Sequence, residues 1–206
     1  MNFRKTLEEL RRINKKRRFD QSVDLIINLK DFDPKRESLE IFIILPHGPK
    51  KKIAGFLEHP SPHVYSITKN EIERLSVADL RKLAKQYDFF VANAKLMPLI
   101  AQKFGKVLGS LGKMPDPKLG AVLLQESDKA IAEVAEKLSR AVKIKAKEPS
   151  LKLMIGKESM PDEEIIENAN AVMRALIPAL PKKEANLKSI LLKFTMSKPV
   201  KVEIEK

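Results

Sequence analysis

The hydrophobic pattern of the sequence changes twice along the chain, and these two changes constrain the fold more than any other feature. Between residues 51 and 148, short apolar runs alternate with longer stretches of helical periodicity, as in the βαβ units of a parallel sheet. The segments before and after share another style, in which helices and apolar strands do not alternate in this regular way. The sequence therefore predicts a discontinuous α+β domain, a small sheet with packed helices, from residues 1–50 and 149–206. An α/β domain of residues 51–148 is inserted into it, with hinges near 47–52 and 146–150.

The flanking segments are predicted to hold three helices and three strands. The expected helices cover residues 3–13, 161–176 and a stretch from a cap at Asp20 or Ser22 to Leu29, and the expected strands cover 39–45, 151–155 and 190–195. In the inserted stretch we expect strands at 53–57, 64–67, 88–92 and, at the edge, 142–146, and helices at 70–87 (broken near Ser76), 97–108 and 127–141.

The charge balance favours a polyanionic partner. Lys and Arg number 40 against 27 Asp and Glu, which gives a net charge of +13. Each cation near a phosphate releases counterions, so nucleic acid is the leading expectation, although a basic protein without such a partner has the same composition. Cysteine is absent, which excludes disulfides and thiolate chemistry. With no signal peptide or membrane span in the sequence, we expect a soluble, cytoplasmic protein that acts as a monomer off any larger assembly.

Catalytic and metal-binding patterns find little support. The histidines are His47, His59 and His63, and prolines between the last two prevent a helix that would place both on one metal. The stretch GKVLGSLGK has the wrong glycine spacing for a phosphate-binding loop, and Met114 stands where Ser or Thr would hold magnesium. We therefore expect no metal, no cofactor and no enzymatic activity.

Three short segments carry residues suited to RNA. Arg17 and Arg18 precede Phe19, a pattern in which cations bind phosphates and an exposed aromatic ring stacks on an unpaired base, although a solvated helix end beside a core phenylalanine would have the same sequence. The run from Lys50 to Lys52 could contact phosphate or hydrate a hinge. Small polar groups at 195–198 suit a close approach to RNA, but also an ordinary turn.

The segment FGKVLGSLGKMPDPKLG is similar to the signature of the large-subunit ribosomal protein family called L-one, in its archaeal and eukaryotic form. The resemblance extends over nearly the whole chain, through KRRFDQSVDLIINL, the strand ending LPHG, IGKESM and the closing LLKFTMS. It implies a three-layer, Rossmann-like second domain. The first domain would bind the ribosomal RNA of the mobile stalk beside the exit site.

The resemblance also assigns residues. It implies RNA contacts for Arg18, Phe19, Ser22, Lys152, Lys157, Thr195, Met196 and Ser197. The basic run and the polar turn themselves add Arg17 and Lys198, and weaker candidates are Lys50, Lys51, Lys113 and Lys118. Two positions depart from the family pattern. Ser197 replaces a glycine, which changes how closely the backbone can approach RNA. Ser110 and Leu111 replace proline and arginine, so the second domain lacks a cation there.

The function implied is that of a structural constituent of the large ribosomal subunit, involved in movement and release of deacylated tRNA at the exit site. Repression of its own synthesis through its messenger RNA is a further expectation. Two alternatives from the residues remain: an α/β enzyme that acts on RNA, which would need a nucleotide site, and an assembly scaffold, whose binding would resist salt.

Overall fold

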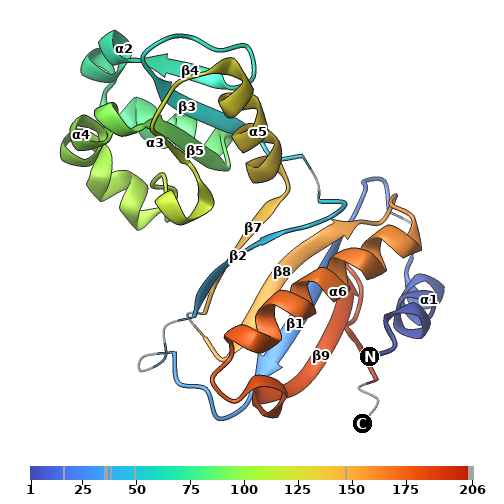
Figure 1. Ribbon diagram of the computed structural model, residues 1–206. Helices are drawn as coiled ribbons and strands as arrows, with labels where there is room; N and C mark the ends of the chain where they lie inside the picture. The colour runs from blue at the N-terminus through green and yellow to red at the C-terminus, as the bar shows by residue number, and fades with distance from the viewer. Residues whose placement is uncertain (16, 35–36, 38, 49, 147, 204–206) are drawn as a thin grey trace. The chain divides into compact units, whose positions relative to one another are not determined.

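The computed structural model describes residues 1–15, 17–34, 37, 39–48, 50–146 and 148–203; Lys16 of the basic run, and Pro49 and Lys147 of the expected hinges, lie outside the described residues. The chain forms two compact units (Figure 1). Unit 1 comprises Met1–Pro49 and Ala141–Lys206, and unit 2 comprises Lys50–Arg140. Among the described residues, no helix has the length and apolar composition that crossing a bilayer requires.

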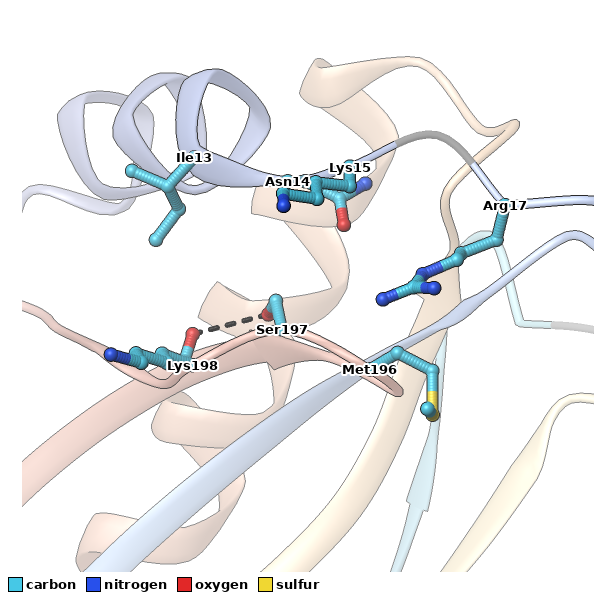
Figure 2. Close-up of a pocket in the computed structure, with 7 residues that line it drawn as sticks. All are labelled: Ile13, Asn14, Lys15, Arg17, Met196, Ser197 and Lys198. Atoms are coloured by element: carbon cyan, nitrogen blue, oxygen red, sulfur yellow. Dashed lines mark hydrogen bonds between the residues drawn. The ribbon is translucent and has the colours of Figure 1, made fainter.

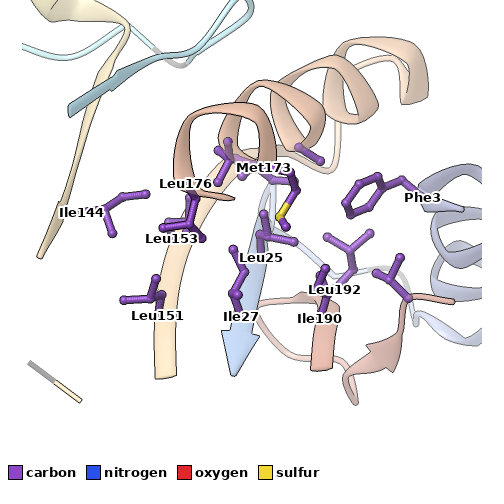
Figure 3. Close-up of a cluster of buried hydrophobic side chains, with 14 of the residues drawn as sticks. Phe3, Leu25, Ile27, Ile144, Leu151, Leu153, Met173, Leu176, Ile190 and Leu192 are labelled. Atoms are coloured by element: carbon purple, nitrogen blue, oxygen red, sulfur yellow. The ribbon is translucent and has the colours of Figure 1, made fainter. Parts of the chain in front are cut away.

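Unit 1 is built on a four-stranded antiparallel sheet with the order β10-β9-β1-β8. Its strands are β1 (Ser22–Leu29), β8 (Ser150–Lys157), β9 (Leu187–Phe194) and β10 (Val200–Lys201). Helices α1 (Phe3–Ile13) and α6 (Asp162–Ala179) cover one face of this sheet, and their apolar sides form a single core with the inward-facing strand residues (Figures 1 and 3). A short 3-10 helix, Lys183–Asn186, leads from α6 into β9.

The segment from Ser22 to Leu29 is a strand, so the prediction of a helix there is wrong. The apolar residues Val23, Ile26 and Ile27 have helical spacing, but the buried residues alternate strictly, at Val23, Leu25, Ile27 and Leu29. This period of two places one side of β1 in the core. Because β1 lies between β8 and β9, pairing on both edges satisfies its backbone groups and overrides the local helical pattern.

A two-stranded sheet completes unit 1. Strand β2 (Glu40–Ile44) pairs antiparallel with β7 (Ala141–Lys145). The prediction that residues 142–146 form an edge strand of the inserted sheet is therefore wrong. Pairing with β2 groups β7 with unit 1, and the chain returns to unit 1 at Ala141 rather than at residue 149.

Unit 2 contains a parallel sheet with the order β4-β3-β5-β6. The strands are β3 (Ile53–Leu57), β4 (Tyr65–Thr68), β5 (Phe89–Asn93) and β6 (Val122–Leu123). The α-helices are α2 (Lys69–Arg74), α3 (Val77–Gln86), α4 (Met97–Ser110) and α5 (Asp128–Ser139), with 3-10 turns at Ala94–Leu96 and Pro117–Leu119. Ser76 caps α3, which confirms the predicted helix break, and Ser127 caps α5.

The second face of the unit 1 sheet carries no helix among the described residues. Its side chains are half-buried or exposed and come from three neighbouring strands: Asp24, Ile26, Asn28, Lys152, Met154, Ser189, Leu191 and Lys193. We refer to this surface as the open face. One cross-strand row is polar and linked by hydrogen bonds, because Asn28 Nδ2 donates to Ser189 Oγ at 2.9 Å and Ser150 Oγ donates to Asn28 Oδ1 at 2.9 Å.

Candidate nucleic-acid interface

Several of the residues singled out from the sequence meet at one end of the unit 1 sheet, where β1 begins and β8 and β9 end. Ser22 lies opposite Lys157, and Val23 lies opposite Phe194, the last residue of β9. Thr195 therefore comes directly beside Ser22. Residues 17–20 lead into β1 at this same end, so segments that are far apart in the sequence form one surface.

The approach to β1 presents its cations and its aromatic ring to solvent. Arg17 and Arg18 are exposed, and 53% of the Phe19 surface is accessible, so Phe19 is not a core residue. The next residue fixes the segment: Asp20 accepts hydrogen bonds from the backbone N–H and the hydroxyl of Ser159, at 3.0 and 2.9 Å. The Asp20–Ser159 hydrogen bonds thus fix the backbone next to Phe19, whose ring is exposed to solvent.

The turn after β9 is tied to the start of β1. The Ser22 N–H donates to Thr195 Oγ1 at 3.0 Å, and the Thr195 N–H donates to the Ser22 carbonyl at 3.1 Å. Met196 follows with 59% of its surface exposed. The turn therefore offers a fixed backbone with an exposed apolar side chain, which suits shape recognition better than a mobile loop would.

Ser197 occupies its position without strain. No positive φ is recorded there, and its hydroxyl oxygen accepts a hydrogen bond from the Phe194 N–H at 2.9 Å. The side chain thus closes the turn from within. The freedom of a glycine is not needed at this position, and the extra atoms bond to the protein's own backbone.

A buried glutamine that we did not single out from the sequence holds the surface together. Gln21 is fully buried, and its Nε2 donates to Asn14 Oδ1 at 3.1 Å and to Glu158 Oε2 at 3.0 Å. Its Oε1 accepts from the Met196 N–H at 3.1 Å. One side chain therefore links the end of α1, the turn after β8 and the turn after β9. No periodicity or charge pattern in the sequence marks it.

Arginine 11 is also structural. Its Nε donates to Asp162 Oδ1 at 2.7 Å, and its two Nη atoms donate to the carbonyls of Glu158 and Met160, both at 3.1 Å. This fork fixes α1 to the start of α6. The Arg11 guanidinium is thus bonded within unit 1, whereas the cations at residues 15, 17 and 18 are exposed.

A hollow of about 290 Å³ opens between the end of α1 and the turn after β9 (Figure 2). Its lining comprises Ile13, Asn14, Lys15, Arg17, Met196, Ser197 and Lys198. Figure 2 shows the Arg17 guanidinium pointing toward Ser197, with Ile13 and Met196 at opposite ends of the hollow. Three of the seven lining residues are cations and none is acidic, so the hollow favours an anionic ligand.

Lysine 152 lies apart from this end, on the open face, where it pairs with Ile26 four residues beyond Ser22 along β1. Its ammonium is 4.0 Å from Glu148 Oε2. Between Ser22 and Ile26 on β1 lies Asp24, which pairs with Lys193 on β9 and Met154 on β8. Burial raises the pKa of Asp24, and the nearby Lys193 opposes that rise.

The four weaker candidates all belong to unit 2. Lys50 and Lys118 are exposed. Lys113 donates from Nζ to the carbonyls of Ala84 at 2.6 Å and Tyr87 at 2.8 Å, and so caps the end of α3. Lys51 is half-buried with Nζ 5.2 Å from the centre of the Phe89 ring, and burial lowers its pKa. Two of the four cations are thus engaged within the unit.

In unit 2 an acidic side chain lies at the place where an α/β enzyme would bind a nucleotide. In an open parallel sheet that place is the crevice at the carboxyl ends of the strands, where the strand order reverses. Here Glu126 occupies it, accepting hydrogen bonds from the backbone N–H groups of Glu58 at 2.7 Å and His59 at 3.2 Å and from Asn93 Nδ2 at 2.8 Å. Among the described residues, no three acidic or histidine side chains are arranged to hold a metal.

Exposed cations, a solvent-facing phenylalanine and a rigid polar turn on one surface form an arrangement of the kind that nucleic-acid-binding proteins use. The sequence comparisons agree with this class. The profile of the ribosomal protein L1p/L10e family matches residues 10–198, and the chain belongs to that family.

Three relatives are large ribosomal subunit proteins uL1 of archaea. That of Nanoarchaeum equitans is 37% identical over 202 residues, covering 93% of this chain and 95% of the relative. Those of Pyrococcus abyssi and Thermococcus kodakarensis are each 38% identical over 202 residues, covering 92% of this chain and 90% and 91% of the relatives. The expected family is confirmed. The chain is a ribosomal protein of the cytoplasmic ribosome, not an enzyme.

Proposed function

We propose that unit 1 binds the ribosomal RNA of the large-subunit stalk through the end of its sheet. The observation that carries the proposal is the convergence of Arg17, Arg18 and Phe19 with Lys157 and the turn from Thr195 to Lys198 on one rigid surface. Cations supply affinity for phosphates, and the fixed polar turn reads 2′-hydroxyls and RNA shape. Lys152 extends the surface onto the open face.

The proposed role in the ribosome is structural. Unit 1 holds the stalk RNA, and unit 2 contacts deacylated tRNA in the exit site and assists its movement and release, with exposed Lys50 and Lys118 available to phosphates. Support for the tRNA role comes from the family resemblance and from the exposed cations of unit 2. A surface that reads RNA shape also accepts the same fold in another RNA, which supports repression through the protein's own messenger.

Equilibrium binding tests the stalk proposal. The full chain is titrated with a stalk ribosomal RNA fragment and with a scrambled RNA of equal length, each over a salt series. We expect tight binding to the stalk fragment that persists at physiological salt while the scrambled RNA dissociates. Equal affinities and equal salt slopes for the two RNAs would refute specific recognition.

Charge-reversal variants locate the surface. Arg17→Glu with Arg18→Glu should weaken binding by about 10-fold or more and make the salt slope shallower by about 0.7–0.9 per lost phosphate contact. The matched control is Arg81→Glu with Lys82→Glu, which changes net charge equally on the exposed side of α3. If the control loses as much affinity as the test pair, the binding is nonspecific.

A competition experiment with messenger RNA tests the repressor role separately from stalk binding. An RNA from the leader of the protein's own messenger should displace the labelled stalk fragment at concentrations where scrambled RNA does not. Competition no better than that of scrambled RNA removes the repressor proposal and leaves the ribosomal one intact.

A further inference from the structure

The hollow beside the turn after β9 has a chemistry that phosphate binding alone does not explain. Two large apolar side chains stand in solvent at its ends: Ile13 is 46% exposed and Met196 is 59% exposed. Between them lie the backbone of the turn and the Arg17 guanidinium (Figure 2). An apolar surface bordered by cations suits a ligand with an uncharged flat body and an anionic edge.

Size narrows the ligand further. The volume of about 290 Å³ lies near the lower limit of pockets that hold small ligands, which range over roughly 300–1,000 Å³. One ring system with its sugar and phosphate fits this space, and two do not. The hollow is also continuous with the RNA surface, because Arg17 and Met196 belong to both.

The polar groups that line the hollow are mostly engaged elsewhere. Asn14 donates from Nδ2 to Glu158 Oε1 at 2.7 Å and accepts from Gln21 at 3.1 Å. The hydroxyl oxygen of Ser197 accepts from the Phe194 N–H at 2.9 Å. Few groups remain to read the hydrogen-bonding edge of a base, so contact here is to the flat body and the charge of the ligand.

We propose that this hollow receives one unpaired nucleotide of the bound RNA. The base lies over the turn and contacts Ile13 and Met196. The backbone phosphates on either side of this nucleotide contact the cations at residues 15, 17 and 198. A base held in a duplex cannot enter, so the hollow distinguishes RNA with an unpaired nucleotide at that place from a continuous helix, without selecting the base. This inference rests on the proposed RNA-binding function of unit 1.

Abasic substitution tests the proposal with the full chain. Each unpaired nucleotide of the stalk fragment is replaced in turn by an abasic one, and affinity is measured for wild type and for Ile13→Ser. For wild type, one abasic position should weaken binding by about 5–10-fold, the scale of removing one stacked base. Ile13→Ser should lose a similar factor with intact RNA and little more with that abasic RNA, because both changes remove the same contact.

Two variants control for unrelated effects. Ile44→Ser changes another exposed isoleucine, 55% accessible on β2 and outside the hollow, and should bind like wild type. Ile13→Val keeps an apolar side chain at the end of α1 and should retain affinity, which separates loss of the contact from disturbance of the helix.

The outcomes separate this inference from the function on which it rests. If wild type prefers the stalk fragment over scrambled RNA, yet every abasic RNA binds like the intact one, the nucleotide site is wrong and stalk binding stands. Additive losses for Ile13→Ser and abasic RNA at every position overturn it in the same way. If the stalk fragment binds no better than scrambled RNA, both proposals fail.

Discussion

Replacing Gln21 with leucine tests whether one buried side chain holds the RNA surface together. The change keeps side-chain volume but removes the hydrogen bonds to Asn14, Glu158 and the Met196 N–H. A neutral hydrogen bond contributes about 1 kcal/mol and one to a carboxylate about 1.5–3 kcal/mol. Better burial of an apolar side chain offsets part of the loss, so we expect the free energy of unfolding to fall by about 3 kcal/mol.

The assay is denaturant unfolding followed by far-UV circular dichroism and by tyrosine fluorescence. Both tyrosines of the chain, Tyr65 and Tyr87, lie in unit 2, so fluorescence follows that unit while circular dichroism follows both. The matched control is Gln102→Leu on the exposed side of α4, expected within about 0.5 kcal/mol of wild type. A loss below about 1 kcal/mol for Gln21→Leu would show that the network is dispensable.

Three further outcomes are expected. Asn168→Ala should lower the free energy of unfolding by about 2–4 kcal/mol in denaturant titrations, because buried Asn168 bonds both backbone groups of His47 and the Ile155 carbonyl. Lys113→Met should destabilise unit 2 by about 1–2 kcal/mol, seen by tyrosine fluorescence, since it removes the cap of α3. Asp24→Asn should stabilise the protein at neutral pH. Since the folded-state pKa of Asp24 is raised, its favourable contribution exists below the unfolded pKa of about 3.8 and is lost as pH rises through the folded pKa; the variant's advantage should therefore vanish in acid. Unchanged pH profiles would contradict this sign.

Much of the fold was predictable where local signals agree with the tertiary environment. Apolar periodicity located α1, α3 and α5, and the short apolar runs located β3 and β5. The strand β1 was not predictable, because three of its apolar residues match a helical period. Only its pairing with β8 and β9 decides between helix and strand. Likewise nothing local shows that β7 pairs with β2, about 100 residues earlier in the chain.

The candidate site shows a similar division. Exposed charged and aromatic residues such as Arg18 and Phe19 stand out in composition and spacing. Gln21 does not, because its role depends on three partners that the fold brings together from positions 14, 158 and 196. Counting charges also overstated the number of cations that unit 2 offers to RNA, because it does not reveal that Lys113 donates its hydrogen bonds to backbone carbonyls.

The position of Glu126 has a consequence for how unit 2 responds to its surroundings. The Glu126 carboxylate accepts hydrogen bonds from the backbone N–H groups of Glu58 and His59, so it competes within the same chain with any dissolved anion for these donors. A dissolved phosphate or nucleotide would have to displace it while Asn93 holds it in place. Unit 2 thus combines a parallel α/β sheet with an acidic side chain at the crevice where such sheets otherwise hold phosphate groups.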